Sequence, residues 1–140
     1  MAATLVTISG TIRAEPRCEL NNNQSIRVNF GDAVKIALID GENYKKPVDF
    51  SIYCRNMKVN TVRLQIMGTG VDFKPAALTT NVSGLGLEFL VNGVSTAVNT
   101  WFRVEYLKLP TVEVVPVKAA NTRLPDGLFT ARAILLLAFD

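Results

Sequence analysis

Histidine is absent from this 140-residue chain, and its absence excludes every kind of site that depends on imidazole. No Ser-His-Asp or Cys-His catalytic arrangement and no imidazole metal ligand can form. The only cysteines, Cys18 and Cys54, lie too far apart for neighbouring zinc ligands. The acidic residues are scattered over predicted turns and outward faces, where solvation explains them. We therefore predict no enzyme activity, no metal, no cofactor and no small-molecule substrate.

Long apolar runs and dense positive charge are missing as well. No stretch reaches the roughly 18 apolar residues that a membrane-spanning helix requires. Met1-Ala2-Ala3 leads straight into an alternating stretch, without the charged start and apolar block of a signal peptide. The sequence is thus expected to begin at a mature protein, at an initiator methionine or in the cytosol. The net charge is only +3, with no basic tract longer than Lys45-Lys46, so no nucleic-acid partner is predicted.

The two cysteines leave two interpretations open. A disulfide between Cys18 and Cys54 would stabilise the fold by about 3.8 kcal/mol in the chain-entropy model. It would also place the protein in an oxidising compartment. Two buried free thiols are the alternative. We favour the disulfide.

The pattern of side chains predicts an all-β chain of one domain. Apolar residues make up 49% of the chain and charged residues 19%, which is typical of a globular protein. No window shows helical periodicity, whereas short alternating segments recur with turn residues between them, among which Asn92-Gly93 is the strongest hairpin signal. This organisation is typical of a β-sandwich. The expected strands cover residues 4–13, 26–30, 48–54, 59–67, 85–91, 94–98, 102–106, 112–117 and 127–140.

The last of these strands is unusually apolar. One of its faces carries only apolar side chains: Phe129, Ala131, Ala133, Leu135, Leu137 and Phe139. Residues 133–139 carry no charge on either face, as expected of a strand buried on both sides. No later residue can pair with its far edge, and an uncovered apolar edge is a template for aggregation. We therefore expect a further strand to cover this edge.

The first strand alternates with equal regularity. Val6, Ile8, Gly10 and Ile12 share one face, with the glycine at a position where a side chain would point at a partner. Pro16 then interrupts the pattern, because proline cannot donate a hydrogen bond to a sheet. The simplest interpretation is an ordinary first strand of the domain's own sheet. Trp101 with Phe102 could form a sugar-stacking surface, but we expect core packing instead.

These features together resemble the pilin subunits of the chaperone–usher pathway, in the type 1 and P fimbria group, over essentially the whole chain. The alternating first strand followed by Pro16 and Cys18 is similar to the donor-strand extension of that family. Residues 28–32, VNFGD, resemble its apolar-x-Phe-Gly-Asp segment, and residues 85–87 resemble the entry to its middle strand. Members of that family carry a glycine fourteen residues from the end and an aromatic residue, usually tyrosine, in the penultimate place. Gly127 and Phe139 occupy these two positions.

The resemblance implies an immunoglobulin-like sandwich that lacks its last strand and is completed by a donor strand in trans. Residues 1–13 would be the donor-strand extension, and residues 14–140 the pilin domain. A periplasmic chaperone would first fill the open groove with one of its strands. The extension of the next subunit would then replace it during assembly at an outer-membrane usher, and neighbouring pilins or a tip adhesin would be the lasting partners. The protein would pass through the periplasm into an extracellular fimbrium.

The resemblance also assigns roles to individual residues. The donor strand would present Val6, Ile8, Gly10 and Ile12, and a disulfide would join Cys18 to Cys54. The acceptor groove and chaperone-recognition strand would consist of Gly127, Phe129, Ala131, Ala133, Leu135, Leu137, Phe139 and Asp140, with the Asp140 carboxylate anchored by basic chaperone residues. Two departures stand out: Phe139 lacks the usual tyrosine hydroxyl, and Thr4 stands where a larger apolar residue is common.

The expected place of the subunit in a fibre follows from its charge and composition. Major rod subunits of the resembled family tend to be acidic and rich in small residues, whereas this chain is basic and richer in valine and leucine. We therefore expect a minor subunit of the tip or an adaptor, with a major rod pilin as the alternative. A self-complete secreted immunoglobulin-like binding module, in which residues 4–13 fold back beside the last strand, is a further alternative. It would be a stable monomer that needs no chaperone.

Overall fold

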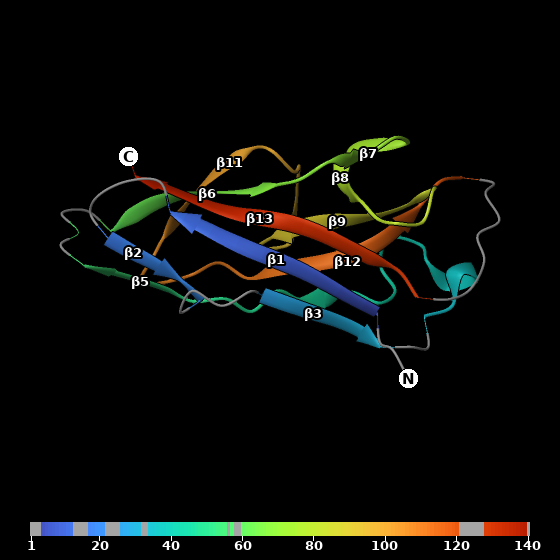
Figure 1. Ribbon diagram of the computed structural model, residues 1–140, viewed down its shortest axis with the longest axis horizontal. Coiled ribbons are helices and arrows are strands. Elements are labelled where there is room, and N and C mark those ends of the chain that lie inside the picture. The colour runs from blue at the N-terminus through green and yellow to red at the C-terminus, as the bar shows by residue number, and fades with distance from the viewer. Residues whose placement is uncertain are drawn as a thin grey trace.

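The structure is a β-sandwich, described here by a computed structural model for residues 4–12, 17–21, 26–31, 34–55, 57, 60–120 and 128–139 (Figure 1). Nearly all of its regular structure is strand, and a 3-10 turn at Ile36–Leu38 is the short helical element of the described part. The strands are β1 (Thr4–Ile12), β2 (Arg17–Leu20), β3 (Ile26–Gly31), β4 (Lys46–Pro47), β5 (Ile52–Arg55), β6 (Thr61–Met67), β7 (Gly70–Val71), β8 (Lys74–Thr79), β9 (Leu85–Val91), β10 (Val94–Thr96), β11 (Trp101–Glu105), β12 (Val112–Lys118) and β13 (Thr130–Phe139).

Two sheets form the layers of the sandwich. The first sheet has five strands in the order β11-β6-β13-β1-β3, and the second has six, in the order β4-β12-β9-β8-β7 with β10 paired to β9. A small two-stranded sheet, β2-β5, lies beside them. Leu64 and Leu137 from the first sheet and Leu87, Phe89 and Val114 from the second are fully buried in one shared core.

Most predicted strands are confirmed to within a few residues, because alternation at period two was clear in each. The Asn92-Gly93 hairpin is also confirmed. Both residues have positive φ, 51° and 79°, which suits the tight turn between β9 and β10. The return strand ends at Thr96 rather than at Val98. Val98 is buried all the same, and its N–H donates to the carbonyl oxygen of Ala76.

The continuous strand predicted for residues 48–54 is wrong. The structure places β4 at Lys46–Pro47 and begins β5 only at Ile52, so the chain leaves one sheet and joins another within this stretch. Val48 keeps a hydrogen bond from its N–H to the carbonyl oxygen of Val112 in the second sheet. The side-chain alternation survived the change of sheet, because both halves still face the same core.

The strands β7 and β8 were not predicted. β8 begins with Lys74-Pro75 and continues with two alanines, residue types that are depleted in strands. It forms all the same, because Leu78 and Thr79 pair with Leu87 and Gly86 of β9. Tertiary pairing therefore decided the conformation of this segment.

Strand β13 is central rather than an edge. It pairs with β6 on one side, antiparallel, and with β1 on the other, parallel (Figure 1). This double pairing covers the edge that the sequence analysis singled out. It also accounts for the apolar run, since Leu136 and Ala138 are buried although they face away from the core shared by the sheets.

Candidate functional site

The candidate site is the strand groove, by which we mean the place between β3 and β13 that β1 occupies. β3 and β13 belong to the same sheet only through β1, which pairs antiparallel with β3 and parallel with β13. In Figure 1, β1 lies between the other two strands. The two ends of the chain thus meet in the middle of one sheet, and the continuity of that sheet depends on its N-terminal strand.

Alternate side chains line the walls of the strand groove. They come from β3 and from the β13 segment, where alternation at period two turns every second residue inward. All of them are buried: Ile26, Val28, Phe30, Phe129, Ala131, Ala133, Leu135 and Leu137. The rings of Phe30 and Phe129 lie 5.7 Å apart between centroids, at a tilt of 41°, so they close the end of the groove where β1 begins. Phe139 is half-buried and packs against the same core.

Two of the predicted donor residues, Val6 and Ile8, point into this groove from β1. Val6 is fully buried, and Ile8 is 1% exposed. Ile8 lines a small interior space together with Ile26 of β3, Leu135 of β13 and Val112 of the second sheet, so it contacts both layers. A strand that supplies Val6 and Ile8 therefore completes the core as well as the sheet.

Thr4 is the polar exception in the groove. Its side chain is completely buried, and its hydroxyl oxygen has no hydrogen-bond partner. A buried hydroxyl without a partner costs about 1–3 kcal/mol. Thr4 stands where the resembled family commonly has a larger apolar residue, and it fills this position weakly because its buried hydroxyl has lost hydration without gaining a partner.

Gly10 of β1 lies close to β2. A Cβ atom added there would lie 3.0 Å from Cβ and 3.1 Å from Cδ1 of Leu20, which belongs to β2. Gly10 is paired in register with Leu135 of β13. The prediction that a side chain would be unwelcome at Gly10 is a steric property of the groove, and Leu20 is the residue that sequence reasoning missed.

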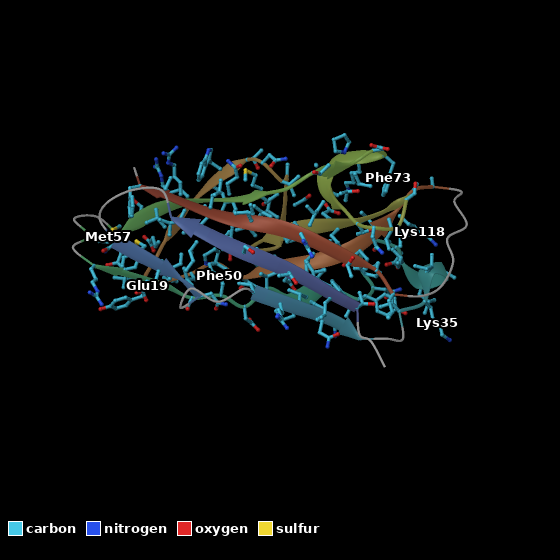
Figure 2. The ribbon with its side chains drawn as sticks, in the orientation of Figure 1. Glu19, Lys35, Phe50, Met57, Phe73 and Lys118 are labelled. Carbon is cyan, nitrogen blue, oxygen red and sulfur yellow. A yellow bond between two sulfur atoms is a disulfide. The ribbon has the colours of Figure 1, made fainter. Side chains whose placement is uncertain are left out.

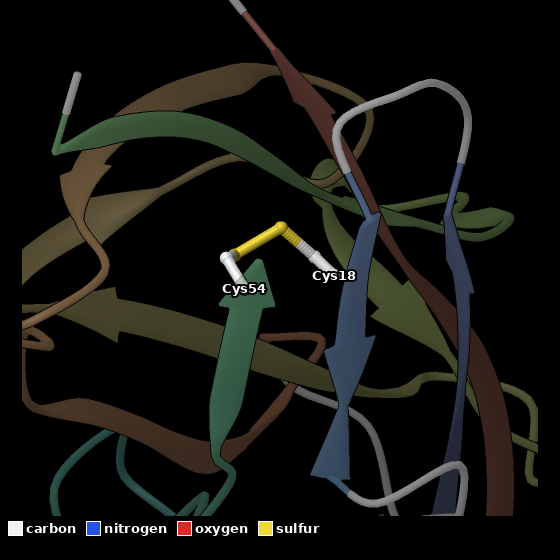
Figure 3. Close-up of a disulfide and its surroundings, with 2 residues drawn as sticks. All are labelled: Cys18 and Cys54. Atoms are coloured by element: carbon white, nitrogen blue, oxygen red, sulfur yellow. A yellow bond between two sulfur atoms is a disulfide. The ribbon is translucent and has the colours of Figure 1, made fainter. Parts of the chain in front are cut away.

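A disulfide joins Cys18 to Cys54 and holds this corner of the molecule together (Figure 3). The two cysteines are register partners in β2 and β5, so the bond is a cross-strand one. Cys18 is two residues from Leu20, and the bond therefore fixes the strand that presses on Gly10. The preferred interpretation of the cysteine pair is confirmed.

The remaining predicted residues are only partly covered by the structure. The backbone of Ile12 lies opposite Leu137. The Ile12 side chain, together with all of Gly127 and Asp140, lies outside the described residues, so the expected carboxylate anchor at Asp140 stays a prediction. At Phe139, the last residue of β13, the carbonyl oxygen accepts a hydrogen bond of 3.3 Å from the guanidinium of Arg63.

Core packing of Trp101 was expected and is wrong. Trp101 is 37% exposed on β11, and the guanidinium carbon of Arg63 lies 5.2 Å from its ring centroid, a cation–π geometry. Its neighbour Phe102 does pack against the core. The alternation along β11 turns Phe102 and Val104 inward, which leaves Trp101 on the outer face.

The charged groups with shifted pKa values lie away from the strand groove. A hydrogen bond from the Ser95 hydroxyl and a second from Lys74 hold the pKa of Glu88, on β9, below its ordinary value against the opposing effect of burial. Glu88 and Lys74 line a hollow together with Phe73 and Lys118. Figure 2 labels Phe73 and Lys118, which lie toward the same end of the molecule. Within the described residues, no group of three or more His, Cys, Asp and Glu could hold a metal ion, and no helix could span a membrane.

The geometry of the site is therefore one for holding an extended strand. A ladder of backbone hydrogen bonds on both sides supplies affinity, and alternate side chains dropped into the groove supply selectivity. The observed strand has apolar side chains at the positions of Val6 and Ile8 and no side chain at Gly10, which is paired with Leu135 and lies close to Leu20.

Solved structures with a similar fold are found among pilus subunits. The chain aligns with the P pilus adaptor subunit PapF at a TM-score of 0.65 and 21% identity, over 89% of this chain and 97% of that one. It aligns with the P pilus rod subunit PapA at a TM-score of 0.63 and 19% identity, over 91% and 95%. At this identity the likeness establishes the fold, which is the immunoglobulin-like sandwich of pilins.

Sequence comparison establishes the family. The chain is 31% identical to the fimbrial-like protein YfcQ of Escherichia coli (strain K12), over 96% of this chain and 86% of that protein. It is 28% identical to the fimbrial-like protein YfcR of the same strain, over 92% and 76%. The family model described as fimbrial protein matches residues 6–140. The protein thus belongs to the fimbrial protein family, and its predicted identity as a pilin of the chaperone–usher type is confirmed.

Proposed function

We propose that this pilus subunit polymerises by donor-strand exchange, using the strand groove as its acceptor site. The observation that carries the proposal is the position of β1 between β3 and β13. These two strands do not pair with each other and are joined into one sheet only by β1. A neighbour's strand could take this place, and β1 could take the corresponding place in another subunit. Because each subunit would give one strand and receive another, the polymer would grow head to tail without closing.

The proposed partners follow from the same site. An extended strand from a periplasmic chaperone would occupy the strand groove before assembly, and a neighbouring pilin or a tip adhesin would occupy it afterwards. An outer-membrane usher would be the site of exchange, and the fibre would lie outside the cell. The apolar walls of the groove support this assignment, because an exposed apolar groove of this length would aggregate unless a strand covered it.

We also propose a minor position in the fibre, as a tip or adaptor subunit rather than a major rod pilin. The net charge of +3 and the valine- and leucine-rich composition support it. Antibody labelling of fimbriae against this subunit, viewed by electron microscopy, would give isolated sites near the tip. Continuous labelling along the shaft would contradict the minor role and favour a rod subunit.

The experiment that tests the acceptor groove compares thermal unfolding of residues 14–140 with and without a peptide of residues 4–13. Without β1 this chain should be unstable, and the peptide should raise its unfolding temperature strongly. Burying Val6 and Ile8 contributes about 1.5–3 kcal/mol each, in addition to a new backbone ladder. The matched control is the same peptide with Ile8→Asp, which should not stabilise the chain.

The alternative function is a self-complete binding module of the same fold. It is favoured by one observation, namely that β1 fills the groove of its own chain. The two functions separate in the same experiment. If residues 14–140 are stable alone and indifferent to the peptide, donor-strand exchange is wrong and the closed module remains.

A further inference from the structure

The direction of β1 in the groove is the starting point of a further inference, which rests on the proposed acceptor function. β1 runs parallel to β13, with Val6 opposite Ala131, Ile8 opposite Ala133 and Gly10 opposite Leu135. Because β1 is antiparallel to β3, the two walls of the groove run in opposite directions, and a strand entered either way makes one parallel and one antiparallel ladder. Backbone pairing therefore does not choose the direction, and the reason for it has to come from the side chains.

Side-chain sizes along β1 and β13 are complementary in this direction. The two larger donor side chains, Val6 and Ile8, lie opposite alanines, whereas the glycine lies opposite a leucine. The side chains of Val6, Ile8, Ala131, Ala133 and Leu135 are buried, at 7% exposure or less, whereas Gly10 is exposed. Large against small at Val6 and Ile8 fills this part of the groove evenly, which is what a close-packed interior requires.

Reversing the strand destroys this match. If β1 entered antiparallel about Ser9, which lies opposite Ile134, then Ile8 would face Leu135 and Gly10 would face Ala133. Two large side chains would then share one place and two small ones another. Overpacking and cavities are both destabilising. Sliding the reversed strand by two residues returns Gly10 to Leu135, but it then places Ile8 opposite Leu137 and Val6 opposite Phe139, again large against large.

We propose that β1 is an intramolecular cap: the isolated subunit closes its own groove with its own strand, parallel to β13, and does not polymerise with itself. A strand within the same chain has a high effective concentration, so a second copy's β1 competes poorly. Assembly then requires a strand whose side chains match the groove better than β1 in the cap. Such a strand comes from a different subunit or a chaperone, not from a second copy of this chain.

The cap is also built to be displaced. Its first buried residue, Thr4, carries the hydroxyl without a partner. A competing strand with an apolar side chain at that place gains over β1 at once. The cap thus prevents self-assembly without preventing assembly with a better-matched partner.

Disulfide trapping in the full-length chain tests direction and connectivity together. Leu5 lies opposite Thr130 in the observed register and would lie opposite Ala138 in the reversed strand, so the pair Leu5→Cys with Thr130→Cys is compared with Leu5→Cys and Ala138→Cys. Under mild oxidation only the first pair should cross-link, within one chain, as read by non-reducing gels and peptide mass mapping. Light scattering should show a monomer throughout.

Three outcomes of this experiment overturn the cap: a cross-link in the second pair, a cross-link between chains, or no cross-link in either pair. Spontaneous polymers of the wild-type chain would do so as well. The result is separable from the test of the proposed function. If the peptide rescues residues 14–140 and the cross-link is missing, the groove is real and only the cap is wrong.

A second measurement examines how fast an added peptide displaces β1 from the strand groove. Gly10→Val in the full-length chain would push β1 against Leu20, while Ser9→Val adds the same side chain on the exposed face of the strand. A fluorescent peptide of residues 4–12 should bind to the Gly10→Val chain at least about tenfold faster than to the wild type or to Ser9→Val. Equal rates for all three proteins, or no binding to the Gly10→Val chain, would contradict the cap.

Discussion

The two sheets of this sandwich are completed in different ways. In the second sheet, β9 and β12 pair antiparallel over residues 85–91 and 112–118, and each lies within the body of the chain. In the first sheet, β1 and β13 pair parallel and come from opposite ends of the chain. Both pairs bury apolar side chains in the same core, so burial alone does not tell them apart. Connectivity and strand direction do.

The difference assigns different roles to the two pairs. The β9–β12 pair cannot be replaced from outside, because the remaining strands are attached to both of its members. In the proposed exchange the β1–β13 pair is replaced, because withdrawing β1 leaves β2 to β13 connected. A permanent sheet and an exchangeable seam would then share one hydrophobic core.

The largest expected effect separates these roles directly. Phe89→Ala in β9 and Ile8→Ala in β1 should lower the free energy of unfolding by about 3–5 and 2–5 kcal/mol, respectively, since both side chains are fully buried. An added peptide of residues 4–12 should restore the Ile8→Ala chain and leave the Phe89→Ala chain unchanged. Denaturant unfolding with and without the peptide measures both effects. Equal rescue of the two variants, or of neither, would remove the distinction between the sheets.

A smaller effect of opposite sign is expected at Thr4. Thr4→Val keeps the shape of the side chain and removes the buried hydroxyl that has no partner, so it should raise the free energy of unfolding by about 1–2 kcal/mol. The control, Thr7→Val, changes the same residue type on the other face of β1, where Thr7 is half-buried. Denaturant unfolding should show a gain for Thr4→Val alone. A loss at Thr4 would mean that the hydroxyl is hydrated or bonded.

The smallest effect concerns acid and belongs to the second sheet. The pKa of Glu88 is lowered in the folded protein, so its contribution is present above the unfolded pKa and is lost as the pH falls through the lower folded value. The gain is below about 1 kcal/mol for such a partly exposed ion pair. Glu88→Gln should remove this part of the acid sensitivity, as measured by unfolding between pH 6 and about pH 3. An unchanged pH profile would show that the contacts with Ser95 and Lys74 contribute nothing.

Much of the fold could be predicted because burial leaves a period-two pattern in a sandwich. The residues of β1, β3 and β6 alternate cleanly, and these strands, like β9 and the more continuously apolar β13, are where the sequence predicts them. β8 and the break before Ile52 could not be predicted, since pairing with β9 and a change of sheet overrode local preference. Trp101 was misjudged because its aromatic character was given more weight than the alternation of Phe102 and Val104, which places it on the opposite face of β11.

The site divides in the same way. The sequence by itself determined which side chains face the groove, from Val6 and Ile8 to Leu137, because the alternation of a strand fixes the face of every residue. Only the tertiary structure decided that Leu20 crowds Gly10, that the Thr4 hydroxyl has no partner, and that β1 runs parallel to β13. These properties depend on which strands become neighbours and in which direction. The alternation of apolar and polar residues is the same when it is read in either direction, so it cannot encode them. Side-chain sizes distinguish the two directions only once the neighbour and its register are known.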